Sequence, residues 1–321
     1  MFGESLQGYN NTAILFIIFN RPSTTQHVFH AIKRAKPTRL YIAADAPRVG
    51  NAADEAKCKA ARAVTEQIDW PCEVKRLFRD ENLGCGRAVS EAINWFFKHE
   101  SEGIILEDDC LPHPDFFTFA STMLTHYRND QRIVSINGSS LGYHPANKNS
   151  YSYSRFMNMW GWATWKDRAI QIDYQLNEWK QIRNKTRWVY NHTKQYLFDA
   201  DINWYRLWRN KFTKVAADPG FTWDWQWMYH QLRNKQFSIV PAVNLISNIG
   251  FDADATHTFE AANPAANISL EATPSPLIHP SDIKPDLIYE EQYVKWVWCY
   301  HKRLPAMFYF KQFISRLIGR S

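Results

Sequence analysis

Residues 13 to 22 read Ala-Ile-Leu-Phe-Ile-Ile-Phe-Asn-Arg-Pro, a continuous apolar run that ends at polar residues and a proline. A short run without polar alternation predicts a strand buried on both faces, as in a parallel sheet covered by helices. Residues 22 to 36 follow with apolar side chains at helical spacing, and residues 40 to 44 return to a strand pattern. The opening of the chain therefore predicts a strand, a helix and a second strand.

The same alternation continues over the first 110 residues. We expect a helix near 51 to 68, a strand at 74 to 78, a helix opened by Gly84 and Gly86, and a strand at 103 to 106. Strands that alternate with helices predict a doubly wound α/β sheet, mostly parallel, which binds ligands beyond the carboxyl ends of its strands. The polar residues expected at those ends are Arg21, Asp45, Glu107, Asp108 and Asp109.

The rest of the chain has a weaker pattern. We expect a helix from Pro114 to about Arg128, a strand at 133 to 136, a polar loop to about Ser150, tryptophan-rich helices within 165 to 213 and over 222 to 234, and a strand at 237 to 240. Residues 251 to 288 are rich in Ala, Asn, Asp and Pro with little periodicity, which predicts a long loop.

The composition limits the class of protein. Of 321 residues, 45% are hydrophobic and 22% charged, as in a folded chain with a large core. The net charge of +6 suits phosphate-bearing ligands, but no sharp basic cluster predicts a nucleic-acid partner. Five cysteines without a CxxC spacing predict neither a zinc site nor a disulfide framework, and they favour a reducing, cytoplasmic compartment. No stretch approaches the ~20 apolar residues of a membrane span.

The acidic triplet Glu107-Asp108-Asp109 follows directly after the apolar residues of a predicted buried strand. Three adjacent carboxylates in a partly desolvated crevice repel one another unless a cation neutralises them. Oxygen ligands of this kind suit Mg²⁺ or Mn²⁺. The alternative is that the acids cap the next helix or lie solvated on a turn.

Residues 104 to 117, Ile-Ile-Leu-Glu-Asp-Asp-Cys-Leu-Pro-His-Pro-Asp-Phe-Phe, resemble the acidic metal motif of GT-A nucleotide-diphospho-sugar transferases. The resemblance is to the inverting N-acetylglucosaminyltransferase I group and to bacterial HlpA-like sugar transferases, and it runs from about residue 12 to 260. It implies a Rossmann-like GT-A fold and a metal-dependent inverting glycosyltransferase of polysaccharide biosynthesis. The implied donor is a nucleotide-diphospho-sugar, UDP-sugar being expected, and the acceptor a glycan or a lipid-linked acceptor.

The resemblance also implies roles for individual residues. Asp109 would bind the metal directly, while Asp108 and Glu107 would hold ribose or water ligands. Arg21 and Asp45 match positions that contact the nucleotide base, and Arg87 resembles a further nucleotide-contacting position. We therefore divide the chain into a GT-A domain over 1–260, with a nucleotide-binding half at 1–110 and a sugar and acceptor half at 111–260, and a helical C-terminal extension over 261–321.

An inverting transfer needs a carboxylate that accepts the proton of the acceptor hydroxyl. Asp224, within Phe-Thr-Trp-Asp-Trp-Gln-Trp at 221 to 227, is the candidate because aromatic rings can fix its rotamer, and the resemblance implies the same residue. The alternative is a first-turn helix residue placed by the helix dipole. Asp218 is the second candidate, although it precedes Pro-Gly and has the pattern of a turn residue.

Two further segments match parts of the family's donor site. Residues 159 to 165, Met-Trp-Gly-Trp-Ala-Thr-Trp, resemble a glycine–tryptophan turn that lines the donor sugar, which implies contacts from Gly161 and Trp162. Residues 247 to 258 lie where family members carry a loop that orders over the nucleotide sugar. There His257 would complete the metal shell or bind the diphosphate, the alternative being a surface histidine in a loop.

The C-terminal residues 304 to 321 place apolar side chains on one helical face, with basic residues toward its edges. Such a helix can lie in the membrane interface, which predicts a peripheral contact with the inner face of the membrane. The alternative is a helix packed on its own domain.

Two other functions remain open from the sequence. A nucleotidyltransferase of similar fold usually carries a glycine-rich phosphate loop after its first strand, where this chain has Asn20-Arg21-Pro22. A non-catalytic nucleotide-sugar binding protein is the other, because a fold does not dictate a function.

Overall fold

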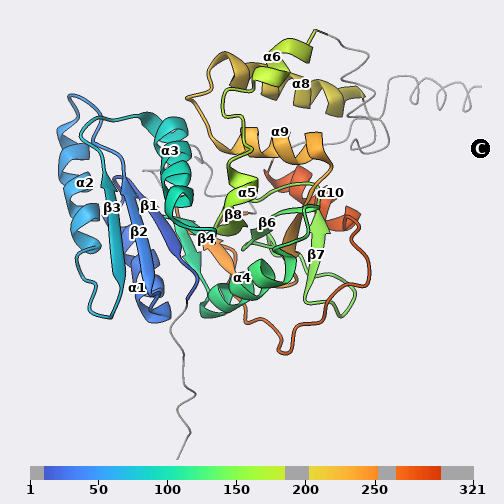
Figure 1. Cartoon of the computed structure of the whole chain (residues 1–321), viewed down its shortest axis with the longest axis horizontal. Helices are drawn as coiled ribbons and strands as arrows, with labels where there is room; N and C mark the ends of the chain where they lie inside the picture. Colours follow the sequence, from blue (N-terminus) through green and yellow to red (C-terminus); the bar gives the residue numbers. More distant parts are fainter. Residues whose placement is uncertain (1–10, 185–201, 252–264, 298–321) are drawn as a thin grey trace, which may run out of the picture.

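The computed structural model describes residues 11–184, 202–251 and 265–297 (Figure 1). Its centre is an eight-stranded sheet. The strands are β1 (Ile14–Ile18), β2 (Arg39–Ala44), β3 (Glu73–Phe78), β4 (Glu102–Glu107), β6 (Ile133–Asn137), β7 (Tyr151–Ser154), β8 (Trp162–Trp165) and β9 (Phe237–Pro241). Two more strands, β5 (Cys110–Pro112) and β10 (Ile246–Asn248), pair antiparallel in a small separate sheet.

The order in the large sheet is β3-β2-β1-β4-β8-β6-β9-β7. Strands β3, β2, β1 and β4 are mutually parallel, and β6 and β9 run in the same direction, because β8 is antiparallel to both β4 and β6. Only β8 and β7 in this sheet run the opposite way. The predicted α/β fold with a mostly parallel central sheet is therefore confirmed, and it is consistent with a Rossmann-like GT-A fold.

Helices cover both faces of the sheet (Figure 1). The helices in the described part of the chain are α1 (Pro22–Ala35), α2 (Ala52–Val64), α3 (Gly84–His99), α4 (Pro114–Tyr127), α5 (Lys166–Ala169), α6 (Asn177–Ile182), α8 (Ile202–Ala217), α9 (Asp224–Asn234) and α10 (Leu287–Val297). Side chains of α1, α2 and α4 pack with Ile14, Phe16 and Ile18 on one face, whereas α3, α9 and α10 pack on the face of Leu15 and Ile17. Helix α8 lies beyond α9 and packs on it and on α6 (Figure 1). Every residue of β1 is buried, as the continuous apolar run predicted.

Several details differ from the sequence-based expectation. Residues 162 to 165, which we expected to form part of a turn, are the strand β8 between β4 and β6. Strand β7 was not predicted either, and the helices expected within 165 to 213 divide into α5, α6 and α8. Short aromatic runs fit a helix and a strand equally well, so only the tertiary pairing decides.

The predicted loop at 251 to 288 lies partly outside the described residues, and α10 begins at its end, at Leu287. The helix predicted at 304 to 321 lies wholly outside them. Among the residues that the structure describes, no helix is long and apolar enough to cross a membrane.

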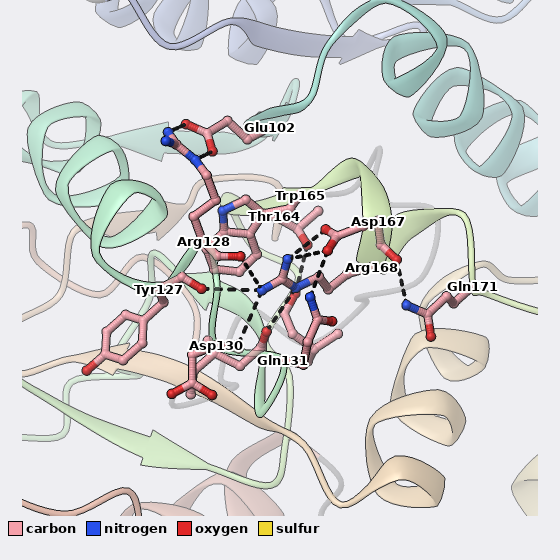
Figure 2. Close-up of polar contacts among 12 residues, drawn as sticks. Glu102, Tyr127, Arg128, Asp130, Gln131, Thr164, Trp165, Asp167, Arg168 and Gln171 are labelled. Carbon is pink, nitrogen blue, oxygen red and sulfur yellow. Dashed lines mark hydrogen bonds and ion pairs between the residues drawn. The ribbon is translucent and has the colours of Figure 1, made fainter.

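A buried arginine fixes the end of α4, the helix that follows the acidic triplet (Figure 2). The guanidinium of Arg168 donates to the backbone oxygens of Tyr127, Arg128 and Asp130 at 2.9–3.3 Å. It also lies 4.4 Å from the ring centroid of Trp165, at the end of β8. The oxygens of Tyr127 and Asp130 also accept from the backbone N–H groups of Asp130 and Ile133, whereas Arg168 is the donor to Arg128. Arg168 therefore completes the end of α4 and joins it to the centre of the sheet.

Replacing Arg168 with methionine should destabilise the fold, because the side chain keeps its bulk while the carbonyl oxygen of Arg128 loses its donor and those of Tyr127 and Asp130 lose a second one. We expect the free energy of unfolding to fall by about 2–4 kcal/mol in urea titrations. The control is Asp167→Asn, whose side chain is 52% exposed although it pairs with Arg168; it should cost less than about 1 kcal/mol. Equal losses in the two variants would contradict this role for Arg168.

Candidate active site

The candidate site lies where parallel strands of the large sheet end together. Ile17 of β1 is opposite Glu107 of β4, and Ile18 is opposite Ala44 of β2. Because the three strands run in the same direction, the segments that follow them emerge at the same edge. The structure therefore brings Arg21 and the acidic triplet together and places Asp45 at the same edge, as the alternating pattern predicted.

Arg21 is the cation that faces the triplet. Its Nη1 donates to Oδ2 of Asp109 at 2.6 Å and lies 3.8 Å from Oδ1 of Asp108. Burial lowers the pKa of Arg21, but the charges of Asp109 and Asp108 outweigh burial and leave it raised. On the other side, the backbone N–H of Phe19 donates to Oδ2 of Asp108 at 2.9 Å. Among the described residues, one guanidinium thus faces the three carboxyl groups.

The carboxyl groups of the triplet are poorly compensated. Burial is the largest cause that raises the pKa of Glu107 well above its usual range, followed by the charges of Asp109 and Asp108. Burial and the charge of Asp109 raise the pKa of Asp108 to about 7, in spite of Arg21. The raised pKa values of Glu107 and Asp108 indicate that the described residues supply less positive charge than these two carboxylates need.

The segment after β10 closes over the triplet. The backbone N–H of Ile249 donates to the carbonyl oxygen of Asp109 at 2.8 Å. A Cβ on Gly250 would lie 2.4 Å from Oδ2 of Asp109 and 2.8 Å from Nη1 of Arg21, so only glycine fits there. Gly250 begins the loop predicted to order over the donor. His257 of that loop lies outside the described residues, and its role stays a prediction.

Asp224 reaches the same region through a close backbone contact. A Cβ on Gly86, in the first turn of α3, would lie 2.2 Å from the carbonyl oxygen of Gly220 and 2.9 Å from the backbone nitrogen of Thr222. The start of α3 and the turn before α9 therefore touch without side chains between them. This contact requires glycine at position 86 and brings the first residue of α9, Asp224, toward the strand ends.

Only one oxygen of the Asp224 carboxylate, Oδ1, is hydrogen-bonded among the described residues. Its Oδ1 accepts hydrogen bonds from the hydroxyl of Thr222 and from the backbone N–H of Trp225, the latter at 2.9 Å. Among the described residues, Oδ2 has no hydrogen-bond partner. The charge of Asp224 is also among the causes that raise the pKa of Glu107, after burial and the other two acids. Asp224 therefore lies within electrostatic range of the triplet.

Cys85 is a member of the site that the sequence did not indicate. It precedes Gly86 on α3 and is exposed, but nearby protein atoms and the charges of Glu107, Asp224 and Asp109 raise the pKa of its thiol. Those charges place the thiol among the acids of the site. A single cysteine without a motif gave no signal in the sequence. Gly250 lies within the predicted loop at 247 to 258, and its contact with Asp109 depends on the pairing of β10 with β5.

Asp45, which follows β2, and Arg87, in the first turn of α3, both lie near the start of that helix. The carboxylate of Asp45 accepts hydrogen bonds from the backbone N–H groups of Leu83 and Gly84 at 3.0 Å. Burial raises its pKa, although these bonds act against the increase. Asp45 therefore holds the start of α3. Arg87 is exposed and pairs with Glu91, one turn further on, at 3.1 Å. The predicted nucleotide contacts of both residues stay predictions.

Gly161 and Trp162 are placed differently from what the turn motif suggested. Gly161 has a φ of +60°, and a Cβ there would lie 2.6 Å from the side chain of Ile246, so packing within the protein explains the glycine. The ring of Trp162 is fully buried and stacks on Trp223 at 6.0 Å between centroids. Trp162 thus supports the residue before Asp224, and no part of its ring is exposed to a ligand.

The carboxylates of the triplet suit a metal ion that takes most of its ligands from water and substrate. No group of three or more His, Cys, Asp or Glu side chains that could hold a metal occurs within residues 11–184, 202–251 and 265–297. Arg21 already occupies one oxygen of Asp109. Mg²⁺ and similar ions are usually held by one or two carboxylates together with water and substrate phosphates. The uncompensated charge of the triplet fits such an ion.

No family model matches the chain, and no curated protein matches it at a significant level. Among solved structures, it is similar to HddC from Yersinia pseudotuberculosis, with 12% identity over 49% of this chain and 77% of that chain and a TM-score of 0.31. Mouse xyloside xylosyltransferase 1 has 10% identity over 70% of this chain and 82% of that chain, with a TM-score of 0.33. A UDP-glucose pyrophosphorylase complexed with UDP-glucose has 14% sequence identity to this chain. The match covers 45% of this chain and 62% of that chain, with a TM-score of 0.24. Scores this low carry no inference about function.

The pKa of Asp108 gives a pH dependence that can be measured in the metal-free protein. Because its pKa is near 7 in the folded chain and near 4 when unfolded, the native state binds the extra proton between these values. The free energy of unfolding should therefore fall as the pH rises from 5 to 8. With a chelator present, Asp108→Asn should lose less stability over this range than the wild type, by on the order of 2 kcal/mol.

The control for this measurement is Asp282→Asn, whose carboxylate is 66% exposed and pairs only with Lys284 among the described residues. It should keep the pH dependence of the wild type. If Asp108→Asn and the wild type lose equal stability between pH 5 and 8, the fold does not raise the pKa of Asp108.

Proposed function

We propose that this chain is a metal-dependent inverting glycosyltransferase that moves a sugar from a nucleotide-diphosphate donor, with UDP-sugar preferred, to a glycan or lipid-linked acceptor. The observation that carries the proposal is the meeting of two kinds of carboxylate at one edge of the sheet. A strained acidic triplet follows β4, and a separate carboxylate with one unbonded oxygen, Asp224, begins α9. The resemblance of residues 104 to 117 to the GT-A metal motif supports the same assignment.

At the donor end, Asp109 would hold Mn²⁺ or Mg²⁺ together with oxygens of the diphosphate. When bound, the ion would stabilise the negative charge that develops on the departing nucleotide diphosphate. Arg21 keeps the carboxylate of Asp109 oriented through its 2.6 Å contact. Gly250, packed on Asp109, leaves no side chain beside this carboxylate.

At the acceptor end, Asp224 would act as the general base. The hydrogen bonds to its Oδ1 fix the carboxylate and leave Oδ2 to accept the proton of the acceptor hydroxyl. As the proton passes to Oδ2, the hydroxyl oxygen attacks the anomeric carbon from the side opposite the diphosphate, and the bond to the diphosphate breaks. The sugar is thereby transferred with inversion.

Asp224→Asn tests this assignment because asparagine keeps the size and the hydrogen-bonding of Oδ1 but cannot accept the proton. A thermal-shift screen of nucleotide sugars with and without Mn²⁺ first identifies the donor. We expect the variant to bind that donor with unchanged affinity, and its transfer rate to fall by roughly a hundredfold or more. Asp218→Asn, an exposed neighbour in the preceding turn, is the matched control and should keep both properties.

Three results would contradict the proposal. If Asp224→Asn transfers sugar at the rate of the wild type, Asp224 is not the base. If the chain joins a nucleoside triphosphate to a sugar phosphate, it is a nucleotidyltransferase. If it binds nucleotide sugars and neither Asp224→Asn nor Asp109→Asn changes any activity, it is a non-catalytic binding protein.

A further inference from the structure

Helix α8 presents positive charge without acidic residues to balance it. Its sequence contains Arg206, Arg209, Lys211 and Lys214 and no aspartate or glutamate. Within the described part of the chain, none of the four is in an ion pair, and both lysines are exposed. Glu178, on the adjacent α6, is already paired with Arg233 of α9 at 2.8 Å. Among the described residues, the positive charge of α8 is therefore not balanced by carboxylates.

The two lysines stand over two aromatic rings. Nζ of Lys211 lies 5.1 Å from the ring centroid of Trp225, and Nζ of Lys214 lies 5.8 Å from that of Phe221. Phe221 is 53% exposed, and Trp225 is partly exposed. The rest of Trp225 is fixed by edge contacts with Trp208 and Phe212 of α8. Ring faces and ammonium groups thus occur together on a rigid support.

This cationic and aromatic patch borders the candidate base. Phe221 comes three residues before Asp224, and Trp225 comes directly after it. Trp225 also donates its backbone N–H to Oδ1 of Asp224, so its position and that of the carboxylate are linked. The two rings and the carboxylate therefore belong to one short segment at the start of α9.

The position of the patch indicates which substrate it meets, a step that rests on the proposed function. In an inverting displacement, the base lies on the side of the sugar opposite the departing diphosphate. Positive charge beside the base therefore faces the acceptor. We propose that Lys211, Lys214, Phe221 and Trp225 form the acceptor subsite, and that the acceptor is a saccharide bearing a carboxylate or phosphate group. The rings would stack on a sugar face, and the ammonium groups would pair with the anion.

The test compares acidic saccharides with neutral counterparts. The full chain is applied to a glycan array that carries uronic-acid and phosphorylated saccharides, each beside its carboxyl-reduced or dephosphorylated form. We expect at least tenfold stronger binding to the acidic member of one class, and weaker binding at high salt. The class that binds identifies carboxylate or phosphate as the recognised group. Lys211→Gln/Lys214→Gln should reduce that binding about tenfold.

The matched control is Lys59→Gln/Lys98→Gln, which removes the same charge from exposed positions on α2 and α3 and should bind as the wild type does. The increase in melting temperature caused by the donor and Mn²⁺ measures binding at the donor site separately. This increase should be the same in the wild type and in both double variants. If the acidic saccharides bind while no nucleotide sugar does, the patch is a glycan site and the transferase proposal fails.

Two outcomes would overturn the acceptor subsite. One is equal binding of acidic and neutral saccharides, or of the wild type and Lys211→Gln/Lys214→Gln. The other is capture by phosphatidylglycerol vesicles that the same double variant abolishes, without any preference for acidic saccharides on the array. The patch would then be a membrane-binding surface.

Discussion

The site depends on an unbalanced charge at the end of a buried strand. Three carboxyl groups lie at the end of β4, and among the described residues Arg21 is the cation paired with two of them, Asp108 and Asp109. Burying like charges costs free energy, and the raised pKa values of Glu107 and Asp108 record that cost. A fold can retain such a cost when a ligand removes it in the working state. The rest of the fold places Ile249, Gly250 and the candidate base Asp224 near these carboxyl groups.

The second half of the chain completes the site through packing rather than charge. Strand β8 runs between β4 and β6 and carries Trp162, whose ring supports Trp223. The bare backbone contact of Gly86 with Gly220 then sets how closely α9 approaches α3. Many of the aromatic residues that make this chain unusual are therefore structural, since they hold Asp224 in position instead of lining the ligand.

Local patterns in the sequence were sufficient for the parallel strands and for the acids at their ends. The unbroken apolar run of β1 predicts a strand buried on both faces. Acids placed directly after such a strand emerge at the edge of the sheet. The position of β8 could not be predicted, because Trp-Ala-Thr-Trp acquires its place only by pairing with β4 and β6. Long-range contacts also decide the roles of Gly250 and Cys85. The buried position of Trp162 had no local signal, so its sequence motif suggested a ligand contact.

The most direct test of the central claim is anomalous scattering from crystals grown with Mn²⁺ and UDP. We expect a manganese peak about 2.1 Å from a carboxylate oxygen of Asp109, with diphosphate oxygens completing the coordination. A map with bound UDP in which Asp109 remains paired with Arg21 alone, and no manganese peak near the triplet, would contradict the account.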